Sequence, residues 1–91
     1  MIRSGQVTVT TAGTAVQAGT DSALREYWIR ARAANTGDIY IGNNGSDSVA
    51  ATTGLALSKT DAPILVRCKL SELWVDAASN GDKLTWLVSI P

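Results

Sequence analysis

The side chains that could act as acids, bases or nucleophiles are few in this sequence. The 91 residues contain no histidine, which removes the commonest general base and the commonest ligand for transition metals. Glutamate occurs at two positions, Glu26 and Glu72. Serines and threonines are frequent, but none can be paired with a histidine that would activate it. We therefore expect a protein that is not an enzyme, with no catalytic residues and no cofactor.

Three aspartates, Asp38, Asp76 and Asp82, carry the oxygen atoms that calcium prefers as ligands. A calcium site needs several such oxygens at one point, and the common calcium loop has an Asp-x-Asp-x-Asp-Gly spacing. That spacing is absent from the chain. We interpret the three aspartates as turn and strand-edge residues, and we predict no metal site.

Two further motifs carry little chemistry. Residues 43–47, Asn-Asn-Gly-Ser-Asp, could bind a sugar but are more typical of a solvated loop, and no Gly-Lys-Ser/Thr follows Gly42 to make a phosphate-binding loop.

Cys68 is the single cysteine, so no intrachain disulfide can form. It shares an alternating face with Ile64 and Val66, which predicts a buried, unreactive thiol. This cysteine usage fits folding in a reducing cytoplasm.

The charge balance argues against two classes of partner. The chain carries 8 basic and 8 acidic residues, so its formal net charge is zero. Binding to nucleic acid or to an anionic membrane normally requires a basic surface. No apolar run is long enough to span a bilayer, and the first residues lack the apolar stretch of a signal peptide. We therefore expect neither nucleic acid nor membrane as a partner.

The elements that position these residues are predicted to be short strands. Helical periodicity is nearly absent, and turn-forming residues recur between short alternating runs, as in sandwiches and barrels. We predict an all-β, single-domain antiparallel β-sandwich of about seven to eight short strands over residues 6–91, after a short N-terminal arm at residues 1–5. Asn80-Gly81-Asp82 predicts a hairpin turn, and residues 49–57 a loop between the two sheets. The predicted strands cover residues 6–11, 14–17, 26–34, 39–42, 64–70, 73–77 and 83–90.

Residues 26–34 alternate most clearly. Tyr27, Ile29 and the following odd positions are mostly apolar, whereas the even positions are mostly charged, so the odd set should face the core. Trp28 then lies on the outer face beside Arg30 and Arg32. Because Trp and Arg are enriched in binding hot spots, we interpret these three as subunit contacts. The alternatives are that Trp28 packs under a loop or that a β-bulge shifts the register.

The same pattern occurs on three other predicted strands. Tyr40, Trp74 and Leu87 each lie opposite the aliphatic face of their strand, and outward apolar residues on several strands suggest a covered surface. We add these three to the candidate subunit interface. The alternative is a two-sided core, capped by the long segment 43–63. Trp86 differs, because it shares a face with Leu84 and other aliphatic residues, and we assign it to the core.

Five short segments carry a further signal through their order and spacing. They are residues 13–17 (GTAVQ), 29–33 (IRARA), 35–42 (NTGDIYIG), 73–82 (LWVDAASNGD) and 84–86 (LTW). In this order they resemble small virion proteins of tailed bacteriophages, similar to capsid decoration (cement) proteins with a jelly-roll-like β-sandwich, and the likeness extends over residues 6–90. Residues 43–63 depart from the family pattern, because they lack its compact glycine-and-proline loop.

The resemblance implies a protein that sits as a homotrimer on the outer capsid surface, bound to the major capsid protein, after synthesis in the host bacterial cytoplasm. The alternative is a receptor- or carbohydrate-binding β-sandwich module of a tail fibre or spike. Such a module is usually part of a longer polypeptide, whereas we expect the chain that begins at Met1 to be complete. The candidate capsid contacts are Ile2, Arg3, Gln6, Asn43, Asn44 and Lys59.

Overall fold

Alternating apolar and polar residues build eight strands in the computed structural model of the chain, which describes residues 1–43 and 54–90. A single short 3-10 helix, η2 (Leu70–Glu72), is present in these residues. No helix in the described part has the length and apolar character to cross a membrane. The strands are β1 (Ile2–Thr8), β2 (Val16–Gln17), β3 (Leu24–Ala31), β4 (Ile39–Gly42), β5 (Leu55–Leu57), β6 (Ile64–Lys69), β7 (Trp74–Ala77) and β8 (Lys83–Ser89).

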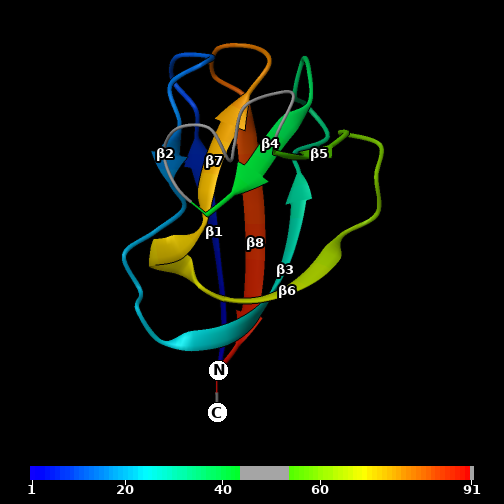
Figure 1. Cartoon of the computed structure of the whole chain (residues 1–91). Helices are drawn as coiled ribbons and strands as arrows, with labels where there is room; N and C mark the ends of the chain where they lie inside the picture. The colour runs from blue at the N-terminus through cyan, green and yellow to red at the C-terminus, as the bar shows by residue number, and fades with distance from the viewer. Residues whose placement is uncertain (44–53, 91) are drawn as a thin grey trace.

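The strands form two antiparallel four-stranded sheets (Figure 1). We call them the β3 sheet, with order β1-β8-β3-β6, and the β4 sheet, with order β2-β7-β4-β5. Strand β1 pairs with β8, β2 with β7, β3 with β6 and β4 with β5, as though one long hairpin were wrapped into two layers. This is the strand order of a jelly roll. The predicted all-β antiparallel sandwich is therefore confirmed.

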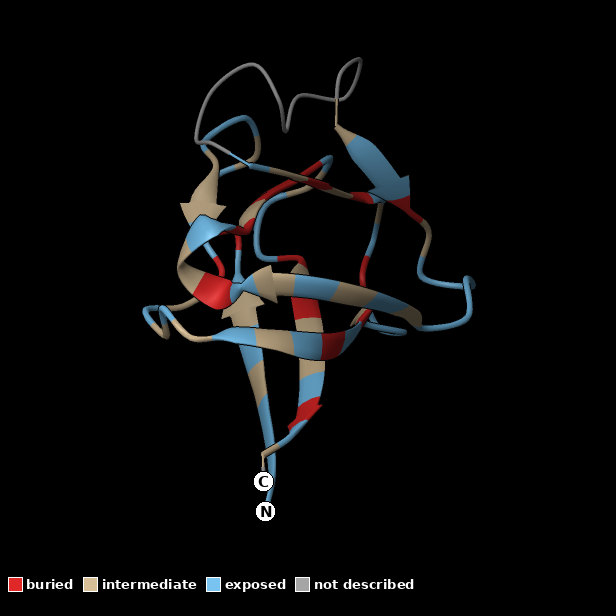
Figure 2. Ribbon diagram, turned by 60° about the horizontal axis from the view of Figure 1, so that its bottom comes forward, coloured by how far each residue is buried: buried red, intermediate tan, exposed pale blue. Residues whose placement is uncertain are grey.

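The core lies between the two sheets and is built by the inward half of each strand. Figure 2 shows buried residues alternating with exposed ones along the strands, as expected when side chains point to opposite faces in turn. Strand β3 contributes Tyr27, Ile29 and Ala31, each about 1% exposed. The opposite sheet contributes Ile39 and Val75, which are completely buried.

Trp86 belongs to the inner face, as its alternation predicts. Its ring meets Tyr27 edge to face, with ring centroids 5.5 Å apart, a favourable geometry for two aromatic rings. The Trp86 ring also lies over Gly5, its partner across the β1–β8 ladder. A Cβ at position 5 would lie 2.5 Å from Trp86 Cζ2, so this close approach requires glycine.

The N-terminal residues form a strand and not an arm. Strand β1 starts at Ile2 and stays in register with β8 through Thr8, where the sequence pattern predicted a strand over 6–11. The two ends of the chain lie together at the bottom of Figure 1. The Met1 ammonium donates a hydrogen bond to the Ile90 carbonyl at 2.8 Å, and Ile90 N–H donates to the Met1 carbonyl. The alternation was too weak before Gln6 because Arg3, Ser4 and Gly5 give no apolar signal.

The predicted hairpin at Asn80-Gly81-Asp82 is a different kind of turn. Strand β7 belongs to the β4 sheet and β8 to the β3 sheet, so the turn carries the chain between layers. Gly81 has the positive φ of 82° that the sequence signal predicts. The Asn-Gly-Asp motif determines the backbone angle of the turn. Which strands pair depends instead on how the apolar faces of all the strands are buried together.

The segment before β5 connects two neighbours of one sheet. Strands β4 and β5 pair with Ile39 opposite Leu57, so the predicted sheet-to-sheet crossing over 49–57 is wrong at its end. Residues 49–53 of that prediction, and residues 44–53 of the proposed cap over 43–63, lie outside the described residues. Strand β5 was missed because three residues, one of them alanine, give little periodic signal.

We predict that Gly5→Ala lowers the free energy of unfolding by about 2 kcal/mol, because the added methyl overpacks Trp86. Chemical denaturation followed by tryptophan fluorescence measures the change. Ser4→Ala, on the outer face of the same strand, is the matched control and should shift stability by less than about 0.5 kcal/mol. Equal stability of Gly5→Ala and the wild type would contradict the packing described for Trp86.

Candidate binding face

The outer face of the β3 sheet exposes a row of three large apolar side chains. Trp28 is paired with Leu65 of β6 on one side and with Leu87 of β8 on the other. The three residues, which we call the Trp28 row, are 49%, 48% and 43% exposed. The ladders from Leu24 to Ile29 and from Tyr27 to Ala31 are continuous, so no bulge shifts the register. The row is therefore a contiguous apolar strip across the middle of a sheet face.

Shallow hollows lie on both sides of Trp28 along β3. The larger, of about 590 Å³, lies toward the start of β3 and is lined by Glu26, Leu65 and Arg67 among others. The smaller, of about 210 Å³, lies toward its end and is lined by Arg30 and Pro63. Trp28 lines both hollows. The face thus offers an aromatic ridge with a recess at each side, the shape that accepts side chains of a partner.

The charges on this face are mainly basic. Within the four strands of the β3 sheet, all of them described, one acidic residue, Glu26, points outward. The Lys69 ammonium lies 3.8 Å from the Glu72 carboxylate of η2. Because both side chains are exposed, this ion pair reduces the positive charge of Lys69 only weakly. The outward basic residues of the sheet are Arg30, Arg67, Lys69 and Lys83.

Arg25 does not add to this basic surface, because its guanidinium forms an ion pair with Asp21 at the end of the sheet. Its Nε lies 3.1 Å from the Asp21 carboxylate, which also accepts a hydrogen bond from Ala23 N–H at 2.9 Å. The hydrogen bond from Ala23, and then the one from Arg25, hold the pKa of Asp21 below its ordinary value. The pair leaves Arg25 neutralised, at the rim of the larger hollow.

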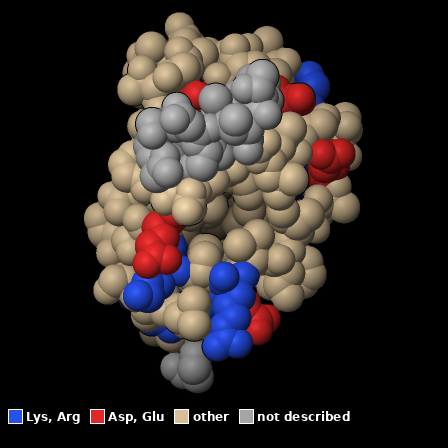
Figure 3. Space-filling model, viewed as in Figure 1, with Lys and Arg blue, Asp and Glu red and all other residues tan. Residues whose placement is uncertain are grey.

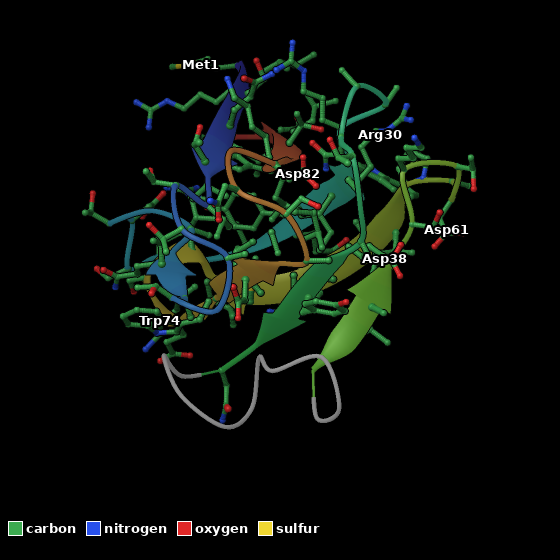
Figure 4. All side chains as sticks on the ribbon, turned by 90° about the horizontal axis from the view of Figure 1, so that it is seen from above. Met1, Arg30, Asp38, Asp61, Trp74 and Asp82 are labelled. Carbon is green, nitrogen blue, oxygen red and sulfur yellow. The ribbon has the colours of Figure 1, made fainter. Side chains whose placement is uncertain are left out.

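The structure divides the predicted subunit contacts between two faces. Trp28, Arg30 and Leu87 lie together on the β3 sheet, and exposed Arg32 follows directly after β3. Tyr40 and Trp74 belong to the β4 sheet, where both point outward and are half-buried. Figure 4 shows Arg30 and Trp74 on different sides of the molecule. These six residues therefore cannot form one continuous patch.

The predicted capsid contacts are also dispersed. Ile2 and Gln6 point outward on β1, in the same sheet as the Trp28 row, and Ile2 is 70% exposed. Arg3 lies on the inward side of β1 and lines a recess at the sandwich end with Trp86. Asn43 and Lys59 are exposed on the loops that flank β4 and β5. Asn44 lies outside the described residues.

Sequence reasoning missed one member of the Trp28 row. Leu65 alternates with Ile64 and Val66, which predicts that it points outward, but alternation within one strand does not connect it with Trp28. The connection depends on strand order, which brings β6 next to β3. Leu24, at the start of β3 and 55% exposed, was hidden because that strand was predicted to begin at Glu26.

Of the three aspartates considered as calcium ligands, Asp76 and Asp82 accept hydrogen bonds from backbone N–H groups, and Asp38 is exposed to solvent. Asp82 is buried, and its carboxylate accepts hydrogen bonds from Thr36 N–H and Gly37 N–H at 2.9 and 2.8 Å. Asp76 accepts from Gly13 N–H at 2.9 Å. Asp38 is exposed. Among residues 1–43 and 54–90, no group of three or more acidic or cysteine side chains could hold a metal ion.

Asn35 completes the polar contacts at this end of the sandwich. Its side chain donates to the Lys83 carbonyl at 2.8 Å and accepts from Lys83 N–H at 2.9 Å, like a short piece of strand. Together with Asp82 it ties the turn after β3 to the start of β8. Because both side chains are buried and bonded to backbone, they fix the loops and are not available to a ligand.

Cys68 faces the interior edge of β6 and is partly buried against the core. Burial raises the pKa of its thiol, and the Glu72 charge raises it further. A raised pKa keeps the sulfur protonated near neutral pH, which disfavours nucleophilic reactions.

No protein-family model, no curated protein and no solved structure matches this chain. The functional interpretation therefore depends on the geometry of the β3 sheet and on the sequence resemblance described above.

We expect Asp82→Ala to lower the free energy of unfolding by about 3 kcal/mol, because two backbone N–H groups lose a charged acceptor. Thermal and urea denaturation measure the loss. Asp38→Ala, an exposed aspartate of the same end, should have an effect within about 0.5 kcal/mol. Wild-type stability that falls on addition of EDTA would instead indicate that these carboxylates hold calcium.

Cys68 in the folded protein should react with a thiol reagent at pH 8 at least ~10-fold more slowly than free glutathione, because its pKa is raised and its sulfur is partly covered. Absorbance of the released chromophore gives the rate. Adding urea should bring the two rates together. A native rate equal to that of glutathione would show that the thiol is accessible and ionised.

Proposed function

We propose that this chain is a structural virion protein of a tailed bacteriophage, a capsid decoration protein that binds the outer surface of the major-capsid lattice. The observation that carries the proposal is the Trp28 row, a strip of nearly half-exposed apolar side chains at the centre of a sheet face. Such a strip is costly in water and is typical of a surface that another protein covers. The sequence resemblance names the class of partner.

The proposed mechanism is passive. A protein that binds the expanded lattice but not its disrupted form adds its binding free energy to the stability of the shell. A small jelly-roll sandwich suits this role, because its ladders hold the row rigid, so little conformational entropy is lost on binding. The homotrimer is part of the proposal through the resemblance, and a closed three-fold unit would match local three-fold positions of the lattice.

A carbohydrate- or receptor-binding module remains the second candidate. It is favoured by one feature, the position of Trp28 beside Glu26 and Arg67, which together could stack on and hydrogen-bond a sugar ring. The leucines on both sides of Trp28 favour a protein partner, since a sugar face requires polar groups next to the stacking ring.

The test is co-sedimentation of the purified chain with expanded capsids and with procapsids of the phage that encodes it. We expect binding to expanded capsids and little to procapsids, because the contacts are proposed to exist in the expanded lattice. The molecular mass in solution, measured in parallel, should correspond to three chains.

Absence of binding to both particles would reject the proposal. Binding to host-surface polysaccharide instead, with loss on Trp28→Ala, would establish the second candidate. A chain that stays monomeric in solution yet binds the shell would contradict a trimer in solution. The trimer could then form only on the capsid lattice.

A further inference from the structure

We propose that the outer face of the β3 sheet docks an acidic protein surface and not a second copy of this chain. The inference rests on the proposed function and names the chemistry that the capsid must present at this contact. It departs from the sequence-based interpretation of Trp28, Arg30 and Leu87 as contacts between copies.

The first observation is the apolar centre of the face. The Trp28 row crosses three neighbouring strands, with Leu24 and Ile2 exposed further along the same face. Tryptophan in such a position is among the residues most enriched in binding hot spots. The hollows on either side of Trp28 give a partner side chain a place to enter beside its ring.

The second observation is the separation of charge in a chain that is neutral as a whole. Glu26 is the one outward acidic residue on the four strands of the sheet, which carry four outward basic residues, although the sequence has equal numbers of acids and bases. Of the other described acidic residues, Glu72 lies in η2 at 3.8 Å from Lys69, and the rest lie in loops or in the β4 sheet. Figure 3, in which the β4 sheet faces the viewer, shows most visible Lys and Arg atoms in its lower half, together with two acidic groups, and mainly acidic atoms among the charged ones in its upper half.

This charge pattern selects between the two possible occupants. Two copies related by a two-fold axis would place the same face against itself and bring Arg30, Arg67 and Lys69 of both copies into one interface. A three-fold assembly uses head-to-tail contacts, so in the proposed homotrimer this face would not meet itself. Like charges brought together at an interface cost free energy and slow association. An acidic partner surface meets the same residues with opposite charge, and the Trp28 row then supplies the apolar contact at the centre.

The test uses expanded capsids as the probe and compares two leucines of similar exposure. Leu65→Ala removes part of the Trp28 row, whereas Leu55→Ala alters a leucine of β5 in the other sheet, 57% exposed against 48%. We expect Leu65→Ala and Trp28→Ala each to weaken capsid binding about tenfold or more. Leu55→Ala should bind like the wild type. Denaturation midpoints confirm that each variant is folded.

Two neutralising variants test the sign of the partner's charge. Arg67→Gln should weaken binding and Glu26→Gln should strengthen it, each by a factor of about 3, since the two residues are paired across β3 and β6 on the same face. Wild-type binding should also weaken as salt rises. Tighter binding by Arg67→Gln would overturn the assignment of an acidic partner.

The remaining outcomes separate this inference from the proposed function. If the wild type binds capsids and the row variants bind equally well, the docking face is elsewhere and the decoration role stands. If the row variants lose the multi-chain mass in solution, a second copy covers the face and the inference is overturned. If the wild type binds no particle, the proposed function and the inference fall together.

Discussion

The register of strand β3 determines both the core of the sandwich and its exposed face. Pairing of β3 with β8 on one side and β6 on the other fixes which side chains enter the core and which remain outside. Tyr27 and Ile29 are sealed within the sandwich, and because strand side chains alternate, Trp28 between them must point to water. A shift of one residue in this ladder would bury Trp28 among charges and expose the core. The fold and the proposed binding face are thus set by one register.

The jelly-roll order explains why the exposed row is continuous. Residues of β8, β3 and β6 are distant in the chain, and wrapping the β3–β6 and β1–β8 pairs into one sheet brings Leu87, Trp28 and Leu65 into a line. The end of the sandwich where the chain crosses from β7 to β8 is held by polar contacts. Asp82 accepts a hydrogen bond from Thr36 N–H, and Asn35 donates one to the Lys83 carbonyl. Apolar pairing across three strands thus forms the exposed row, and buried polar hydrogen bonds fix the turns that connect the sheets.

Local signals in the sequence predicted much of this architecture, and the errors share a cause. The alternation in residues 26–34 assigned the two faces of β3 correctly, and the apolar partners of Trp86 placed it inside. Strand order is not encoded in a local pattern, so the turn at Asn80-Gly81 was taken for a hairpin and Leu65 was not joined to Trp28. For the same reason Tyr40 and Trp74 were grouped with residues of the other sheet. Strand edges with few apolar residues, such as the start of β1, were invisible to periodicity.

A cryo-EM map of the intact particle would show directly whether a partner covers the outer face of the β3 sheet. We expect this sheet to lie against the capsid lattice, with Trp28 in contact with the shell and acidic capsid residues next to Arg30 and Arg67. A map in which the β4 sheet faces the shell while Trp28 is left in solvent would contradict it.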